Sequence, residues 1–138
     1  MFKVLLDTNI YISAILFNGK PKLILQDLID EIFVGYISNE ILDEIEETLA
    51  KPKFKIPNDF IQFTIEEIRN VTTIIKNKPL KDYLNLRDRD DFHILESALT
   101  ANVDFIITGD KDLLTLEKIK NLKIISPDEY LRIKGELS

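Results

Sequence analysis

The sequence lacks cysteine, holds a single histidine and has only four glycines in 138 residues. Without cysteine, neither a disulfide framework nor a thiolate metal site can form. The scattered glycines do not make a phosphate-binding loop of the Walker type. Long apolar runs are missing too, because Asp7 interrupts the apolar start of the chain and no run approaches the ~20 residues of a membrane span. We therefore expect a cytoplasmic protein with no signal peptide and no membrane partner.

Basic residues are outnumbered by acidic ones. Lysine and arginine total 18 against 24 aspartates and glutamates, which gives a net charge of −6 at pH 7. This charge argues against a broad nucleic-acid-binding surface, which is normally basic. It does not exclude a nucleic-acid enzyme, because bound divalent cations can invert the field of an acidic cleft. An acidic cleft would also attract a basic segment of a partner protein.

The remaining composition, 45% apolar and 30% charged residues, is that of a globular protein. No linker or repeat divides the chain, so we predict a single domain over residues 1–138. Strands are predicted at Phe2–Leu6, Ile32–Ile37, Val71–Ile75, Val103–Thr108 and Lys123–Ile125. Helices are predicted at Pro21–Asp30, Asn39–Leu49 (capped by Ser38), Asn58–Arg69, Asp88–Ala101, Lys111–Glu117 and Pro127–Ile133. This alternation indicates an α/β fold with parallel strands and ligands bound beyond their carboxyl ends.

Two of the predicted strands run into an acid. Asp7 follows the first strand, and Asp110 comes two residues after Val103–Thr108. Either residue alone is equally well explained as a helix-cap acid, which helix starts favour. Together they put two carboxylates at the edge of the sheet where a ligand is expected.

A third acid lies on the apolar face of a predicted helix. On the wheel of Asp88–Ala101, at ~3.6 residues per turn, Asp91 is in line with Leu95. A buried carboxylate is costly unless it is paired, and metal coordination is one remedy. The alternatives are a helix cap or a pair with a buried lysine or arginine. Asp88 and Asp90 fall nearer the edges of this face.

The predicted helix after Ser38 is rich in acids. Three of them lie away from its apolar stripe, where ordinary solvated charges are expected: Glu40, Asp43 and Glu47. Glu44 and Glu46 flank the stripe. Glu44 is closer to the helix start, and hence to the carboxyl edge of the sheet, so it is the better candidate for a site.

The single histidine, His93, falls roughly opposite Asp91 on its helix and is predicted to lie at the surface. A serine–histidine or cysteine–histidine nucleophile system of the usual kind is then not available. Carboxylates remain as the main chemical resource. Their hard oxygen atoms suit Mg²⁺ and Mn²⁺.

Four segments, in this order, resemble the motifs of the PIN-domain family, in particular its VapC-like toxins. They are Leu6–Ile10, Ser38–Leu49 with the following Lys51–Phe54, Asp88–Asp91 with Ile94 and Ala98, and Thr108–Leu114. The resemblance implies functional acids at Asp7, Glu44, Asp91 and Asp110. Neighbouring acids are rivals in the last two segments: Asp88, Asp90 and Asp112.

The resemblance covers nearly the whole chain and implies a three-layer α/β/α sandwich with a five-stranded parallel sheet in the order 3-2-1-4-5. It also implies endonucleolytic cleavage of RNA, homodimers, and neutralisation by a small antitoxin. From the acidic charge, we expect this antitoxin to insert a basic residue among the four acids. Arginine would be preferred, because its planar group pairs with carboxylates through two hydrogen bonds.

The expected reaction is metal-assisted hydrolysis of an RNA phosphodiester bond, with Mg²⁺ or Mn²⁺ held by the four acids. Some polar residues could orient the carboxylates or be plain turn and cap residues: Thr8, Asn9 and Thr108. Several basic residues could contact phosphates or be ordinary solvated side chains: Lys20, Lys22, Lys51, Lys53, Lys55, Arg87 and Arg89.

Three other classes of protein are weaker alternatives. A catalytically inactive PIN-like module that binds RNA or protein would lack some of the acids, and all four are present. A receiver-like phosphotransfer domain needs an acidic pair after its first strand and an aspartate after its third, but Asp7 stands alone and Val71–Ile75 runs into Lys76. A phosphatase of the haloacid dehalogenase type needs a second aspartate where Asn9 stands.

Overall fold

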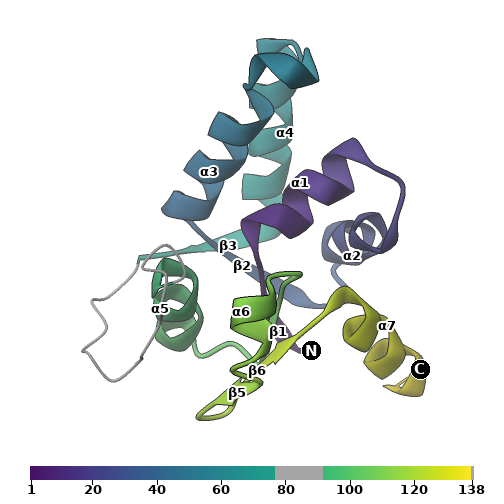
Figure 1. Cartoon of the computed structure of the whole chain (residues 1–138), viewed down its shortest axis with the longest axis vertical. Coiled ribbons are helices and arrows are strands. Elements are labelled where there is room, and N and C mark those ends of the chain that lie inside the picture. Colours follow the sequence, from purple (N-terminus) through teal and green to yellow (C-terminus); the bar gives the residue numbers. More distant parts are fainter. Residues whose placement is uncertain (77–91, 138) are drawn as a thin grey trace.

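The computed structural model describes residues 1–76 and 92–137. Within them, six strands form one sheet in the order β3-β2-β1-β4-β6-β5 (Figure 1). The strands are β1 (Lys3–Leu6), β2 (Val34–Ser38), β3 (Thr72–Ile75), β4 (Phe105–Ile107), β5 (Lys118–Ile119) and β6 (Leu122–Ile125). The helices are α1 (Thr8–Leu16), α2 (Lys20–Ile29), α3 (Asn39–Leu49), the 3₁₀ turn η1 (Pro52–Phe54), α4 (Asn58–Val71), α5 (Phe92–Ala101), α6 (Lys111–Leu114) and α7 (Pro127–Leu137).

The predicted sandwich and strand order are confirmed. Helices cover both faces of the sheet, and five strands run parallel in the order 3-2-1-4-5 when β6 is counted as the fifth. The short strand β5 adds an antiparallel edge to β6 and was not predicted, because two residues carry no periodic signal. Helix α6 was predicted too long, because it ends at Leu114 and not at Glu117.

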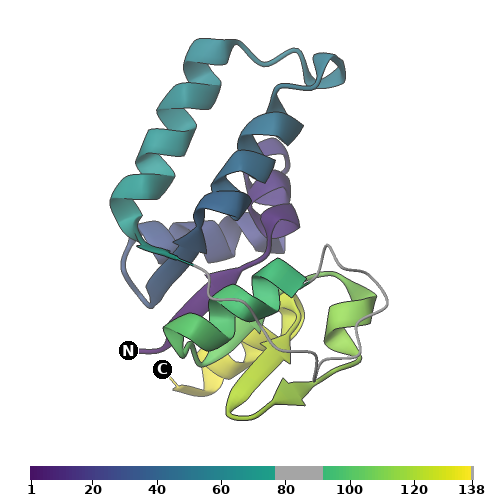
Figure 2. The same cartoon turned by 90° about the vertical axis from the view of Figure 1, so that its left-hand side faces the viewer.

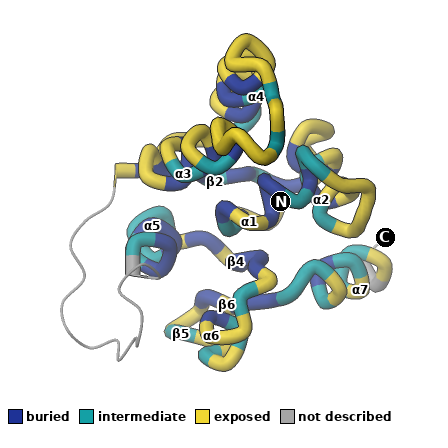
Figure 3. The backbone as a smooth tube through the Cα atoms, turned by 45° about the horizontal axis from the view of Figure 1, so that its top comes forward, coloured by how far each residue is buried: buried dark blue, intermediate teal, exposed yellow. Residues whose placement is uncertain are grey.

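The central strand β1 is enclosed on both faces. Val4, Leu5 and Leu6 are at most 1% exposed, as expected for a parallel sheet covered by helices. Figure 3 shows the same burial along β4, whereas β6 is buried except at Lys123. The predicted bounds of α3 are confirmed, and the Ser38 hydroxyl accepts a hydrogen bond from the Ile41 N–H at 3.1 Å.

Helix α1 was not predicted at all. Its residues Ile10, Tyr11, Ile12 and Ala14 are buried, so the segment is apolar on almost every side and shows no amphipathic period. The helix packs against α2 and α3, and it begins at Thr8, directly after β1. Figure 2 shows α3 and α4 side by side, projecting away from the sheet. No helix in the described ranges is long and apolar enough to cross a bilayer.

Two glycines allow a test of this packing. A Cβ atom on Gly35 of β2 would clash with Cδ1 of Leu28, which is fully buried in α2, whereas one on Gly135 of α7 would meet no atom within 4 Å. We predict that Gly35→Ala lowers the free energy of unfolding by about 1–3 kcal/mol, because Leu28 must leave its packed position. Gly135→Ala should raise it by about 0.5 kcal/mol, because alanine favours the helix. Urea denaturation measures both, and a Gly35→Ala variant as stable as the wild type would contradict the close approach of α2 to β2.

Candidate active site

Three of the predicted acids line one pocket of about 300 Å³: Asp7, Glu44 and Asp110. They reach it from different elements, since Asp7 follows β1, Asp110 follows β4 and Glu44 lies in the middle of α3. The structure thus brings together acids that are up to 103 residues apart in the chain. Their meeting point is the carboxyl edge of the sheet, where ligands bind in folds of this kind.

The fourth predicted acid, Asp91, lies outside the described residues, as do its rivals Asp88 and Asp90. Helix α5 follows them directly. Its residues His93 and Ile94 line the same pocket.

Asp7 is held in place by the strand next to its own. Its backbone N–H donates to the carbonyl oxygen of Ile107 at 3.0 Å, and its Oδ2 accepts a hydrogen bond from the Thr108 hydroxyl at 2.7 Å. Asp7 occupies the N-cap position of α1, but its carboxylate makes no capping bond to that helix. The helix-cap interpretation therefore does not account for Asp7.

Burial raises the pKa of the Asp7 carboxyl above its ordinary value. The hydrogen bond from the Thr108 hydroxyl and, to a smaller extent, the adjacent backbone N–H of Thr8 oppose this rise in the pKa, but do not cancel it. The negative charge of Asp110 raises the pKa further, and His93 lowers it. A partly desolvated carboxylate beside a second one is an arrangement that a bound cation stabilises.

Asp110 is both a helix cap and a residue of the pocket, the two interpretations that its sequence position allowed. Its Oδ1 accepts the N–H of Asp112 at 2.8 Å and so caps α6. Its own N–H donates to the Thr108 hydroxyl at 3.0 Å, the same hydroxyl that donates to Asp7. The rival acid Asp112 is exposed and is not among the residues that line the pocket.

Glu44 of α3 lines the pocket, as predicted. Its Oε1 accepts a hydrogen bond from the Thr8 hydroxyl at 3.0 Å and lies 3.1 Å from Nε2 of His93. Glu46, the other acid beside the apolar stripe, is exposed and accepts a hydrogen bond from Gln62 of α4 at 3.3 Å. The choice of Glu44 over Glu46 therefore agrees with the geometry.

The surface position predicted for His93 is wrong. Its side chain is only 20% exposed, lines the pocket, and lies between Glu44 and Glu40, with 3.6 Å from Nδ1 to Oε2 of Glu40. The helical wheel compared residues within one helix and carried no information about α3, whose Glu40 and Glu44 approach the His93 ring. For the same reason it missed Glu47, which is exposed as predicted but lines the pocket.

Among the candidate phosphate-binding residues, Lys51 lines the pocket. Others are engaged elsewhere: Lys20 pairs with Asp128, and the Lys53 ammonium lies 5.1 Å from the centre of the Phe54 ring. Lys22 and Lys55 do not line the pocket, and Arg87 and Arg89 lie outside the described residues.

The donor set fits a divalent ion in its chemistry. Asp7, Glu44 and Asp110 offer the hard oxygen atoms that Mg²⁺ and Mn²⁺ prefer. Over residues 1–76 and 92–137, no three histidine, aspartate or glutamate side chains are already placed to hold one ion.

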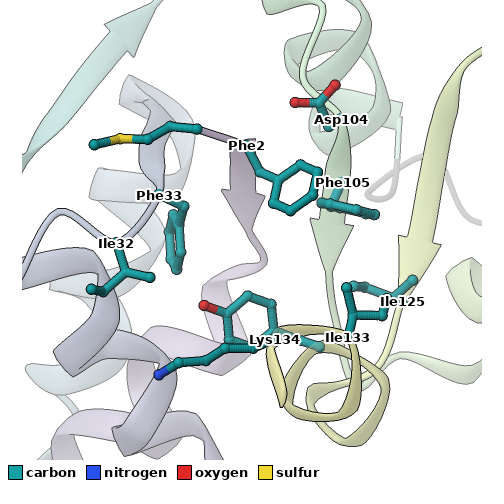
Figure 4. Close-up of a pocket in the computed structure, with 10 residues that line it drawn as sticks. Phe2, Ile32, Phe33, Asp104, Phe105, Ile125, Ile133 and Lys134 are labelled. Carbon is teal, nitrogen blue, oxygen red and sulfur yellow. The ribbon is translucent and has the colours of Figure 1, made fainter. Parts of the chain in front are cut away.

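A larger cavity, of about 710 Å³, lies at the opposite edge of the sheet (Figure 4). Its walls are mainly apolar and include Phe2, Phe33 and Phe105, which stand at the amino ends of strands. Its one lysine, Lys134, is already bound to both carboxylate oxygens of Asp27, at 2.8 and 2.7 Å. This cavity holds no carboxylate pair, so the smaller pocket remains the candidate active site.

Comparison with known families gives a match to the PIN-domain model over residues 3–112. An uncharacterised protein of Methanocaldococcus jannaschii is 35% identical over 140 residues, which cover 94% of this chain and 89% of that protein. A leucine–tRNA ligase of Methanococcus vannielii is 34% identical over 62 residues. That match covers 45% of this chain but only 6% of the ligase, so it carries no argument about the ligase reaction.

Among solved structures, the chain is similar to VapBC2 from Rickettsia felis, a structure bound to a DNA fragment from the promoter of its own genes. The TM-score is 0.64, and the match covers 90% of this chain and 98% of the other. At 20% identity, this likeness shows a shared fold.

The raised pKa of Asp7 predicts that Asp7→Asn stabilises the metal-free protein at neutral pH. A carboxyl whose pKa is higher in the folded state binds its proton more tightly there than in the unfolded chain. Below the ordinary pKa of 3.8, Asp7 therefore does not lower the free energy of unfolding. As the pH rises from 3.8 to the pKa of Asp7 in the folded protein, the free energy of unfolding falls, and above that pKa the loss stays constant. Asparagine carries no charge and can still accept the Thr108 hydrogen bond. Thermal melts in EDTA over a range of pH measure the effect.

The gain in melting temperature should disappear in acid, where Asp7 is protonated in both states. Asp43→Asn, at an exposed position of α3, is the matched control and should show no comparable pH-dependent gain. A wild type at least as stable as Asp7→Asn at neutral pH would contradict the predicted repulsion.

Proposed function

The chain belongs to the PIN-domain family, and from this premise we propose that it is a Mg²⁺- or Mn²⁺-dependent endoribonuclease, the toxin of a toxin–antitoxin pair. The observation that carries the proposal is the meeting of Asp7, Glu44 and Asp110 in one pocket at the carboxyl edge of the sheet. Asp91 is proposed as the fourth acid, on the resemblance of its segment to the family motif.

In the proposed mechanism, the four acids would hold one or two divalent ions. A bound ion lowers the pKa of an attacking water and neutralises charge on the scissile phosphate. The chain itself orients the ligands: the Thr108 hydroxyl holds Asp7, and the Thr8 hydroxyl holds Glu44. No covalent intermediate with the protein is needed.

The proposed substrate is RNA. It would be bound by a few contacts around the pocket and not by an extended basic surface. With a net charge of −6, the chain needs a cation beside the scissile phosphate. Lys51 lies at the rim that Glu47 and Thr48 also line, and it is proposed to contact a phosphate there.

The proposed partner is an antitoxin that places a basic residue, preferably arginine, among the carboxylates. Such a residue would compete with the metal and block the phosphate position at once. The fold that the chain shares with VapBC2 supports this role. We further propose that the protein acts as a homodimer in the cytoplasm, as the family resemblance implies.

Asp110 and Asp112 offer a matched pair for testing the enzyme. We predict that Asp110→Asn lowers Mn²⁺-dependent cleavage of total tRNA or of a single-stranded RNA oligonucleotide by about 100-fold or more, a loss typical of removing one electrostatic catalytic group. The fold should persist, because asparagine also caps helices. Asp112→Asn should retain most of the activity, because Asp112 lies outside the pocket. Wild-type cleavage that is as fast in EDTA as in Mn²⁺, or an equal loss in both variants, would contradict the proposal.

Lys51 and Lys55 form a second pair, one lysine in the pocket wall and one outside it. We predict that Lys51→Gln raises the KM for RNA several-fold and reduces its salt dependence, because one phosphate contact is lost. Lys55→Gln should leave both nearly unchanged. Steady-state cleavage at two salt concentrations measures these quantities, and equal effects of the two substitutions would show that the pocket lysine has no special role.

A further inference from the structure

One oxygen of Glu44 connects three elements. Its Oε1 accepts the Thr8 hydroxyl at 3.0 Å and lies 3.1 Å from Nε2 of His93. Thr8 begins α1 directly after Asp7, Glu44 belongs to α3, and His93 belongs to α5. The orientation of the Glu44 carboxylate is therefore set from two sides by side chains that are not acids.

The histidine ring lies closer to Glu44 than to Glu40. A separation of 3.1 Å is within hydrogen-bond range, whereas the 3.6 Å between Nδ1 and Oε2 of Glu40 is longer than such a bond. Glu40 and Glu44 are four residues apart and so share a face of α3. The ring stands between these two carboxylates and makes its close contact with Glu44.

Fixing Glu44 in advance matters for a metal ligand. A glutamate side chain has three rotatable bonds, and ordering them opposes ligation unless other contacts have already done so. Both contacts described above fall on Oε1, which leaves Oε2 as the oxygen for an ion. Residues that orient a ligand in this way typically change metal affinity by about 10–100-fold when they are removed.

We infer that His93 is a positioning residue, which holds Glu44 with Oε2 available to the divalent ion. This inference rests on the proposed metal-dependent function and extends its machinery to a residue outside the four acids. His93 acts through Glu44 and needs no contact with the metal or the RNA. For this role, the side chain at position 93 needs an N–H group about as far from the helix backbone as Nε2 of histidine.

Glutamine and asparagine separate this role from simple packing between α3 and α5. The amide nitrogen of glutamine reaches about as far from the backbone as Nε2 of histidine, whereas that of asparagine is one methylene shorter. Both are neutral amides at the same position of α5. A packing role depends on filling space, while a positioning role depends on the reach of the donor.

The test is calorimetric titration of Mn²⁺ into the metal-free full chain, for the wild type, His93→Gln, His93→Asn and the control Glu40→Gln. We expect His93→Asn to weaken Mn²⁺ binding by about 10-fold or more, and His93→Gln and Glu40→Gln to stay close to the wild type. Thermal melts in EDTA should show His93→Gln and His93→Asn to be equally folded.

Two results would overturn the inference alone: Mn²⁺ affinity in His93→Asn equal to that of the wild type, or an equal loss in His93→Gln and His93→Asn. Failure of the wild type to bind Mn²⁺ would instead overturn the proposed function, and the inference with it. The two failures are thus distinguishable in one set of titrations.

Discussion

The burial of the Asp7 carboxylate beside Asp110 is the constraint on which the site depends. Both acids sit just past the ends of neighbouring parallel strands, and the Thr108 hydroxyl joins them, donating to Asp7 and accepting from the Asp110 N–H. This link offsets only part of the cost of burial, because the pKa of Asp7 stays raised. The arrangement persists because the strand that leads to it, Val4–Leu6, is among the most buried parts of the molecule. A buried carboxylate beside a second one is unfavourable by itself, and the surrounding core supplies the stability that keeps it in place.

The other parts of the pocket follow from how the chain leaves each strand. After β1 the chain turns directly into α1, so Thr8 faces Glu44 across the pocket. After β2 the Ser38 cap starts α3 at once, which puts Glu44 within two turns of the sheet edge. Two short strand–helix junctions thus place the Glu44 carboxylate beside the Thr8 hydroxyl that donates to it, without any long loop among the described residues.

Much of this arrangement could be predicted from the sequence, because its signals are local. Apolar runs ending in an acid identified β1 and β4, and a capping serine before an amphipathic stripe gave the bounds of α3. The same local reasoning missed α1, since a helix buried on nearly all sides has no polar face to reveal its period. It also misplaced His93, because a wheel shows which residues share a face but not which faces a neighbouring helix covers. Asp91, the acid that the wheel singled out most sharply, lies outside the described residues and remains a prediction.

We propose that the carboxylates of this pocket share a divalent ion. Anomalous diffraction at the manganese absorption edge, from crystals grown with Mn²⁺, tests it most directly. We expect an anomalous peak in the pocket, with carboxylate oxygens of Asp7 and Asp110 within about 2.0–2.2 Å of it, the range for small, hard divalent ions. A peak only outside the pocket, or none at saturating Mn²⁺, would contradict it.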